Sequence, residues 1–313
     1  MLGELNSPQK LPALLFFLFS IFSCPQFARA ESQFTIEAGS SSIDVTVSAD
    51  FPQISTAQLK QWVQNAAAAV IAYYGHYPVP HVLLRIRSFD GRGVRDAQTF
   101  SAHGGLIRIA VGNQTTQEAL ASDWTLTHEM VHLTFPSMPD ENHWIEEGIA
   151  TYVEPIARIQ AGNFNAPRMW FELVRDMPKG LPEPGDQGLD HTHTWGRTYW
   201  GGALFCFLAD IEIRKQTQNK LGLQDALRGI LNSGGDMRQD WPLQKALKAG
   251  DQAVGVDVLT KLYGKMGELP MDVDLPALWK QLGVRQGDGA AQFDDTAPLA
   301  AIRKSITAPR QQN

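Results

Sequence analysis

Apolar and polar residues alternate from Ser42 to Ala49, a pattern typical of a half-buried β-strand. The next segment, Ser55 to Gly75, is rich in alanine, begins with a capping hydroxyl residue and ends at a glycine, which predicts a helix. The apolar runs His81 to Phe89 and Gly105 to Gly112 predict two further strands. The first part of the chain is therefore expected to form a small mixed sheet with one helix.

From Glu118 onward, apolar residues recur at the spacing of helices. The predicted helices are Ala119–Phe135, Trp144–Gln160, Ala166–Asp176, Thr198–Gln216, Leu223–Asn232, Asp257–Met266 and Leu275–Leu282. A stretch rich in proline and glycine, Met177 to Arg197, predicts a long loop. This order predicts an α+β fold, with a strand-rich part over residues 31–117, a helical part over 118–286 and a polar tail over 287–313.

The first thirty residues have the pattern of a signal peptide. The apolar run from Leu11 to Ser23 is short for a membrane span, which needs about 20 apolar residues. Ala28, Arg29 and Ala30 then match an A-x-A cleavage site. We therefore expect an exported protein, periplasmic or secreted, with an uncleaved membrane anchor as the alternative. Contact with a membrane is expected only in that second case.

Charge and cysteine content argue against a nucleic-acid partner and against an internal disulfide. Cleavage after residue 30 would leave 25 basic against 32 acidic residues, a formal charge of −7. An acidic surface of this kind repels phosphate backbones, so we expect no nucleic-acid partner. Cys206 would be the only cysteine left, and its apolar surroundings predict a buried, inert thiol.

The segment LTHEMVHLTF, Leu126 to Phe135, carries the candidate chemistry. His128 and His132 are four residues apart, so on a helix they share a face and can both reach one ion. Imidazole nitrogens in a tetrahedral shell suit zinc. Glu129 could take a proton from a metal-bound water, as in the H-E-x-x-H pattern. The short pattern alone also fits an ordinary surface helix, so a third ligand is needed to distinguish a zinc site from such a helix.

Glu147 is the candidate for that third ligand. It lies on the next predicted helix, with fourteen residues between it and His132. Thr151 and Glu154 follow at i+4 and i+7 on the same face, and Glu154 could accept a hydrogen bond from a ligand imidazole. Glu146 would point about 100° away from that face, so we do not expect it to bind the metal. One zinc ion per chain is therefore expected, held by His128, His132 and Glu147.

The pattern His128-Glu129-x-x-His132, followed by WIEEGIATYVE, resembles the gluzincin zinc metallopeptidases. The likeness is greatest to the aminopeptidase N and glycyl aminopeptidase families. In these families a helix with the pattern W-x-x-E-G supplies the third zinc ligand, which corresponds here to Glu147. The spacer here is shorter than is common in the aminopeptidase N branch. The resemblance implies a thermolysin-like catalytic domain. Gly148, next to Glu147, would let this helix and the helix of His128 and His132 approach closely.

The segment TYWGGALFCFLADIEIR, Thr198 to Arg214, resembles the tyrosine-bearing helix of the same families. The resemblance implies that the hydroxyl of Tyr199 stabilises an oxyanion and that Gly202 lies at a helix contact. A packed aromatic side chain is the alternative for Tyr199. His191 and His193 precede it in the predicted loop, either exposed to solvent or facing a substrate.

Enzymes of the aminopeptidase N branch carry a G-x-M-E-N strand before the zinc helix, and its glutamate holds the free amino group of the substrate. The corresponding stretch here is HGGLIRIAV, which places Ile107 at the position of that glutamate. The glycines predict an edge strand on which a substrate backbone could lie. Because isoleucine cannot bind an ammonium group, we expect cleavage inside peptides rather than at their amino terminus.

The sequence thus predicts an exported zinc peptidase acting on peptides or proteins, with Glu129 as general base and Tyr199 as oxyanion donor. A peptidase-like binding protein without catalysis is one competing interpretation. Glu129 argues against it, because a purely structural zinc site has no use for a base. An aminopeptidase rather than an endopeptidase, and a different zinc hydrolase on the same scaffold, both stay open.

Overall fold

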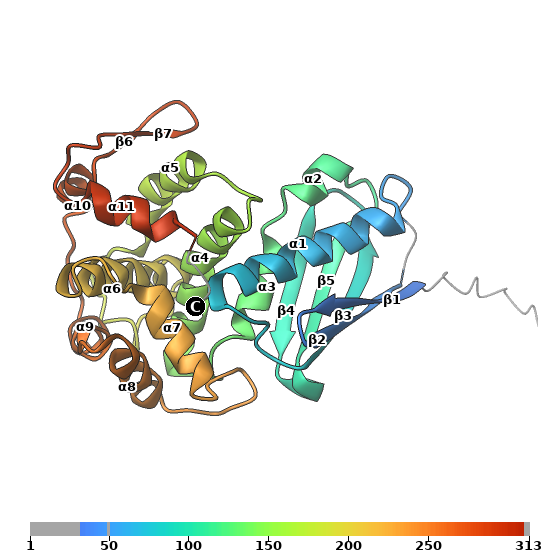
Figure 1. Ribbon diagram of the computed structural model, residues 1–313, viewed down its shortest axis with the longest axis horizontal. Helices are drawn as coiled ribbons and strands as arrows, with labels where there is room; N and C mark the ends of the chain where they lie inside the picture. Colours follow the sequence, from blue (N-terminus) through green and yellow to red (C-terminus); the bar gives the residue numbers. More distant parts are fainter. Residues whose placement is uncertain (1–31, 49–50, 310–313) are drawn as a thin grey trace, which may run out of the picture.

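A five-stranded sheet forms the amino-terminal part of the computed structural model, which describes residues 32–48 and 51–309 (Figure 1). The strands are β1 (Ser32–Ala38), β2 (Ser41–Val47), β3 (His81–Phe89), β4 (Val94–Phe100) and β5 (Leu106–Gly112), in the spatial order β1-β2-β3-β5-β4. Strands β2, β3 and β5 are parallel, and β1 and β4 run antiparallel at the two edges. The three predicted strands are confirmed as β2, β3 and β5, whereas the two edge strands were not predicted.

Strand β5 lies inside the sheet, so our expectation of an edge strand at HGGLIRIAV is wrong. Ile107 pairs with Leu84 on one side and with Thr99 on the other, and its side chain is fully buried. It therefore cannot lie beside a substrate added to the sheet. The outer strand is β4 instead, and the argument for internal cleavage from Ile107 loses its premise.

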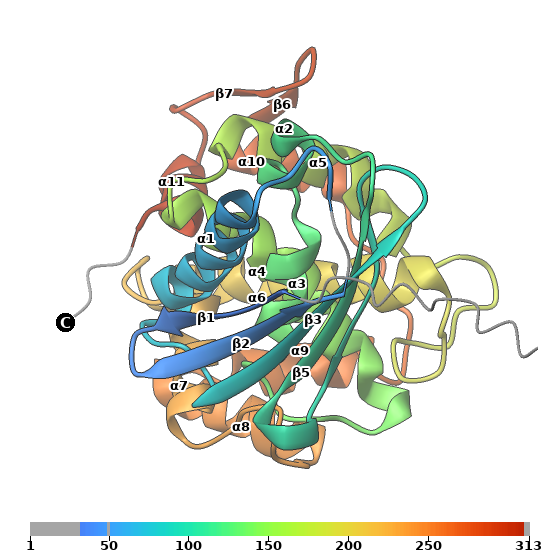
Figure 2. The same ribbon diagram turned by 90° about the vertical axis from the view of Figure 1, so that its right-hand side faces the viewer.

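Helix α1 (Thr56–Tyr74) crosses one face of the sheet (Figure 2). Its amino terminus is capped by Ser55, whose hydroxyl accepts a hydrogen bond from the N–H of Gln58. Its carboxyl terminus ends at Gly75, which has a left-handed conformation with φ 90°. The predicted cap and stop are both confirmed. The apolar side of α1, including Trp62 and Val70, is buried in the core.

The rest of the chain is mainly helical, as predicted, and lies beside the sheet (Figure 1). The helices are α2 (Gln117–Ala121), α3 (Thr125–His132), α4 (His143–Gln160), α5 (Ala166–Asp176), the π-helix η4 (Gly196–Gly201), α6 (Gly202–Gln216), α7 (Leu223–Asn232), α8 (Leu243–Val254), α9 (Val258–Met266), α10 (Leu275–Leu282) and α11 (Ala300–Thr307). Short 3₁₀ turns η1, η2 and η3 cover Ala102–Gly104, Asp140–Asn142 and Met177–Gly180. The single helix predicted from Ala119 to Phe135 is two helices, and α8 was not predicted.

The described part of the predicted polar tail is folded, which corrects that expectation. Strands β6 (Val284–Gln286) and β7 (Ala291–Phe293) form a hairpin, and α11 follows it. Ile302 and Ile306 of α11 are buried, and the guanidinium of Arg303 donates hydrogen bonds to the carbonyls of Leu282 and Gly283. These contacts join the end of the chain to the helical part.

Two glycines set the distance between α4 and α6. A Cβ on Gly202 would lie 2.7 Å from Cα of Gly148, and a Cβ on Gly148 would overlap the backbone of Gly202. The helices therefore touch backbone to backbone. Gly202 lies at a helix contact, as the resemblance implied, whereas the nearest neighbour of Gly148 is in α6 and not in the helix of His128 and His132 as expected. Because α4 carries Glu147 and η4 leads directly into α6, this contact also fixes the spacing between Glu147 and Tyr199.

Gly148→Ala is expected to destabilise the protein by at least ~1–3 kcal/mol, because the new methyl group overpacks a contact between two backbones. Gly264→Ala is the matched control. Gly264 also lies in a helix, α9, and nothing lies within 4 Å of a Cβ at that position. The control is expected to be neutral or slightly stabilising, since alanine favours helix by ~0.5–1 kcal/mol over glycine. Chemical denaturation of both variants measures the difference, and equal stability would contradict the close packing.

The predicted signal peptide, residues 1–30, lies outside the described residues. Within residues 32–48 and 51–309, no helix has the length and apolar character needed to cross a membrane. Cys206 is 1% exposed, and burial raises the pKa of its thiol well above the usual range. The prediction of a buried, unreactive thiol is thus confirmed.

Candidate metal centre

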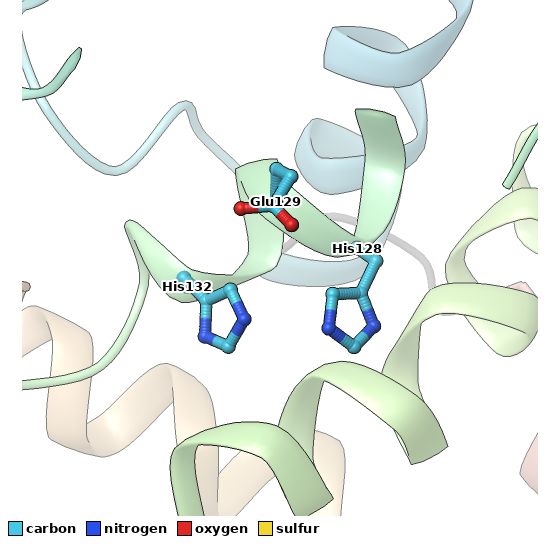
Figure 3. A group of neighbouring side chains, drawn as sticks. All are labelled: His128, Glu129 and His132. Carbon is cyan, nitrogen blue, oxygen red and sulfur yellow. The ribbon is translucent and has the colours of Figure 1, made fainter. Parts of the chain in front are cut away.

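Helix α3 presents the two histidines of the H-E-x-x-H pattern on one side. The rings of His128 and His132 lie side by side with their centroids 5.0 Å apart, and Glu129 leaves the helix in another direction (Figure 3). The helix is deeply packed, so His128 and Glu129 are only 5% and 7% exposed. The pair therefore has the arrangement that helical i, i+4 spacing predicts.

Helix α4 brings Glu147 against both rings. Its Oε2 lies 3.1 Å from Nε2 of His128 and 3.6 Å from Nε2 of His132. Two ligand atoms held ~2.0–2.1 Å from one tetrahedral zinc ion lie about 3.3 Å apart. The observed distances bracket that value, so Glu147 lies at the spacing from each histidine that two ligands of one zinc ion would have.

Glu129 is a second carboxylate near the histidines, with an oxygen within 4.8 Å of a nitrogen of each ring. Its position differs from that of Glu147, whose oxygen is in hydrogen-bond reach of His128. We therefore keep Glu147 as the predicted third ligand and Glu129 as the neighbouring base.

Burial and hydrogen bonds together set the protonation of His132 and Glu147 in the metal-free protein. Burial lowers the pKa of the His132 imidazole to about 4, so this ring is neutral near pH 7. Burial alone would raise the pKa of Glu147, but hydrogen bonds from His128 and His143 outweigh it and hold that pKa well below the usual range. The site thus offers a neutral imidazole and a carboxylate, which are ligands that zinc accepts.

Glu154 and Thr151 lie on the helix α4 that carries Glu147, but Glu154 bonds Arg158 instead of a ligand imidazole. The carboxylate of Glu154 accepts a hydrogen bond of 2.8 Å from Arg158, and burial raises its pKa to about 7. Nδ1 of His128 is buried without a hydrogen-bond partner. The bond from His128 to Glu154 is therefore not formed in this structure, and its formation stays a prediction. Thr151 lines a cavity beside the site.

His143 is a contact that the sequence interpretation missed. Its Nε2 lies 3.3 Å from Oε1 of Glu147, and its Nδ1 lies 3.2 Å from Oε2 of Glu146. These hydrogen bonds, with Glu146 first, raise the pKa of the His143 imidazole to about 10. The ring holds the oxygen of Glu147 that faces away from the two histidines. Its position four residues before Glu147 was a signal that could have identified it.

Thr99 on the outer strand β4 holds the predicted base. Its hydroxyl lies 2.6 Å from Oε2 of Glu129 and 3.0 Å from the main-chain oxygen of the same residue. The shorter contact is a charge-assisted hydrogen bond, which fixes one carboxylate oxygen and leaves the other free. Burial raises the pKa of Glu129, and this hydrogen bond opposes the rise. No local pattern connects residues thirty positions apart, so the sequence could not show this contact.

Thr99→Val is expected to lower kcat by ~10–100-fold, because a hydrogen bond to a charged group contributes ~1.5–3 kcal/mol. Valine keeps the shape of threonine but lacks the hydroxyl. Thr99→Ser keeps the hydroxyl and is the matched control, with kcat expected within about threefold of the wild type. Zinc content and KM should stay the same in both variants. Equal kcat values for valine and serine would contradict the role of the hydroxyl.

Tyr199 lies in the π-helix η4, a distortion of helical structure that is frequent at functional sites. Its ring stacks over that of His128 with a centroid distance of 6.3 Å. Burial, followed by the nearby Glu147 carboxylate, raises the pKa of its phenol to about 12, so the group keeps its proton. The structure thus brings a phenolic donor to the same side of the site as the predicted ligands.

A cavity of about 370 Å³ opens beside His128 and Tyr199. It lies between α4, α5 and η4, and Trp124 and Trp195 are two of its walls. His191 and His193 are exposed and do not belong to its lining. A role for these two histidines on the substrate side therefore gains no support.

Several solved structures share this fold. An aminopeptidase N family protein from Idiomarina loihiensis matches with a TM-score of 0.58 and 13% identity, over 81% of this chain and 49% of that protein. An M1 zinc metallopeptidase from Deinococcus radiodurans matches with a TM-score of 0.50 and 13% identity, over 78% and 54% of the two chains. A two-domain M1 zinc metallopeptidase variant bound to L-tryptophan matches with a TM-score of 0.51 and 13% identity, over 79% and 53%. The chain has the fold of the M1 zinc metallopeptidases.

The M1-like fold confirms the α+β, gluzincin-type architecture expected from the motifs. No protein-family model and no curated protein matches the sequence. The chain spans about half the length of the solved M1 structures that it matches. The shared fold therefore does not by itself establish that this chain has their activities.

Proposed function

We propose that the protein is an exported zinc-dependent peptidase with one zinc ion per chain. The observation that carries the proposal is the convergence of Glu147 Oε2 with the Nε2 atoms of His128 and His132, at distances of 3.1 and 3.6 Å. A buried base beside these ligands and a protonated phenol facing them complete the set that metal-assisted hydrolysis uses. The likeness to M1 zinc metallopeptidases supports this choice among zinc hydrolases.

A zinc ion at this position would polarise the peptide carbonyl and make a bound water more acidic. Glu129 accepts the water proton on its free oxygen, while Thr99 holds the other oxygen in place. Glu129 then returns the proton to the leaving amine. Tyr199 donates a hydrogen bond to the carbonyl oxygen as negative charge develops there. Burial of the base removes competing water and strengthens these interactions.

Tyr199→Phe is expected to lower kcat by ~10²–10³-fold with little change in KM, since its hydrogen bond strengthens in the transition state. Phenylalanine keeps the ring that stacks on His128, so the loss isolates the hydroxyl. Steady-state kinetics on one peptide measures both constants. A change confined to KM would make Tyr199 a binding residue.

The outer strand β4 is the element on which an extended substrate could lie, because one of its edges has no partner strand among the described residues. This arrangement holds a peptide by its main chain and favours neither end. Whether the enzyme is an endopeptidase or an aminopeptidase is decided by one peptide with a free and an acetylated amino terminus. Mapping the products by mass distinguishes internal cuts from stepwise shortening.

Two measurements on the purified protein test the proposal. Metal analysis should find about one zinc ion per chain, and a mixed peptide library should yield defined cleavage products. A zinc-loaded protein that cuts no peptide in the library would favour a peptidase-like binding protein instead. Detection of the mature amino terminus after residue 30 in a periplasmic or secreted fraction would test the predicted export.

A further inference from the structure

We propose that the cavity beside His128 is a subsite for a large, neutral, apolar side chain, aromatic foremost, on the substrate residue next to the bond that is cut. This inference rests on the proposed peptidase function and adds a substrate class to it. Three features of the cavity support it: its position, its walls and the pairing of its charges.

The cavity opens directly on the candidate site, since His128 and Tyr199 form part of its lining. A group bound there would belong to a residue adjacent to the reacting carbonyl. Its volume of about 370 Å³ lies at the small end of the ~300–1,000 Å³ range of ligand pockets. It therefore suits a single large side chain better than a long stretch of peptide.

Two exposed tryptophans line the cavity, and each packs against a residue of the candidate metal centre. Trp124 is 53% exposed and lies edge-on to His128, with ring centroids 5.5 Å apart. Trp195 is 60% exposed and stacks on Tyr199 at 5.7 Å. Exposed rings of this size are unusual in a folded protein, and their grouping at a functional cavity indicates a place where apolar surface is covered by a ligand. Phe164, Met169 and Leu173 extend the apolar wall.

Each charged group in the lining already has an ion-pair partner. Arg158 pairs with Glu154 at 2.8 Å and Lys179 pairs with Asp176 at 2.8 Å. Arg175 also pairs with Asp176, so two cations share that carboxylate and one positive charge is in excess, and Glu172 pairs with Arg168. A lysine side chain would meet no free carboxylate here, and a glutamate would meet only cations that already hold a carboxylate, so either would lose water without gaining a free counter-ion. An apolar side chain has no such cost.

Aromatic side chains are expected to bind most tightly, because their rings can also pack against the ring edges and faces of Trp124 and Trp195. Such ring pairs add to the burial of apolar area. A side chain as small as alanine would leave most of the cavity open. The expected order of preference is therefore phenylalanine or tryptophan, then leucine, then alanine, with lysine and glutamate last.

The test uses a series of peptides that differ only at the residue next to the cleaved bond, with the cut mapped by mass. We expect kcat/KM to be at least ~10-fold higher for phenylalanine than for alanine, because even a few extra carbon groups in an apolar pocket discriminate by ~10–200-fold. Trp195→Ala should reduce this ratio by at least about fivefold. Leu269→Ala is the matched control, since Leu269 is 63% exposed and lies outside the cavity, and it should leave the ratio unchanged.

Binding separates this inference from the peptidase proposal. Acetyl-phenylalanine amide and acetyl-alanine amide are titrated against the zinc-loaded protein, with Trp124 and Trp195 as fluorescent reporters. Tighter binding of the phenylalanine amide, lost in Trp195→Ala, supports the subsite even if no peptide is cut, and in that case only the peptidase proposal fails. Hydrolysis with equal kcat/KM for phenylalanine and alanine peptides, together with equal binding of the two amides, would overturn the subsite and leave the peptidase proposal standing.

Discussion

Glu129→Gln is expected to remove nearly all peptide hydrolysis while the zinc content and the fold stay unchanged. The amide has the size of the carboxylate and can still meet the hydroxyl of Thr99. It cannot accept a proton from water, and loss of a general base costs ~10²–10⁴ in rate. Initial rates on the best peptide of the library, with zinc measured on the same sample, show the effect.

Glu37→Gln is the control for this experiment, because Glu37 is exposed on β1 at the opposite edge of the sheet from β4. It makes the same chemical change and should leave the rate within about twofold of the wild type. If a zinc-loaded Glu129→Gln protein still cut peptides at the normal rate, another group would have to accept the proton and the proposed mechanism would be wrong.

The sequence predicted best the elements whose signals are local. Helix α1 has a hydroxyl cap at Ser55 and a stop at Gly75, and the structure contains both. Helices α5, α7 and α10 begin and end where their apolar spacing predicted. Each of these depends on residues within one or two turns of one another, which a single sequence displays directly.

Edge strands and irregular helices were among the elements that sequence patterns missed. Strand β4 is largely exposed and contains a register shift between Arg95 and Gln98, so it lacks a regular apolar alternation. The π-helix η4 begins at Gly196, inside the stretch predicted as a loop, so the helical segment starts two residues before the predicted Thr198. Missing β4 also produced the error at Ile107, because the order of strands in a sheet depends on pairings between distant segments.

The candidate site was easier to predict than its supporting contacts. Two short patterns on consecutive helices indicated His128, His132 and Glu147, and the structure places these side chains next to one another. The contact of Thr99 with Glu129 depends on packing between a strand and a helix, and its residues share no pattern. His143 was overlooked for a different reason. Its i−4 relation to Glu147 is visible in the sequence, but spacing alone does not show which side chains on a helix face make contact.

Glu147→Ala is expected to weaken zinc binding strongly, whereas Glu146→Ala should leave it nearly unchanged. Oε2 of Glu147 faces the Nε2 atoms of both histidines, while Glu146 contacts only His143 within this group. Removal of a ligand should exceed the ~10–100-fold loss of affinity that follows removal of a group that merely supports a ligand. His143→Ala should fall in that intermediate range, because its Nε2 contacts the other oxygen of Glu147.

The three variants therefore form a graded series that separates the roles of neighbouring residues. Zinc affinity is measured by competition with a chromophoric chelator, and the rise in Tm on adding zinc to the metal-free proteins gives an independent value. The circular dichroism of each metal-free variant shows that its fold is intact. If Glu146→Ala lost the metal and Glu147→Ala retained it, the assignment of the third ligand would be wrong. If His143→Ala bound zinc as tightly as the wild type, the ligand carboxylate would be held by its packing against the two histidines alone.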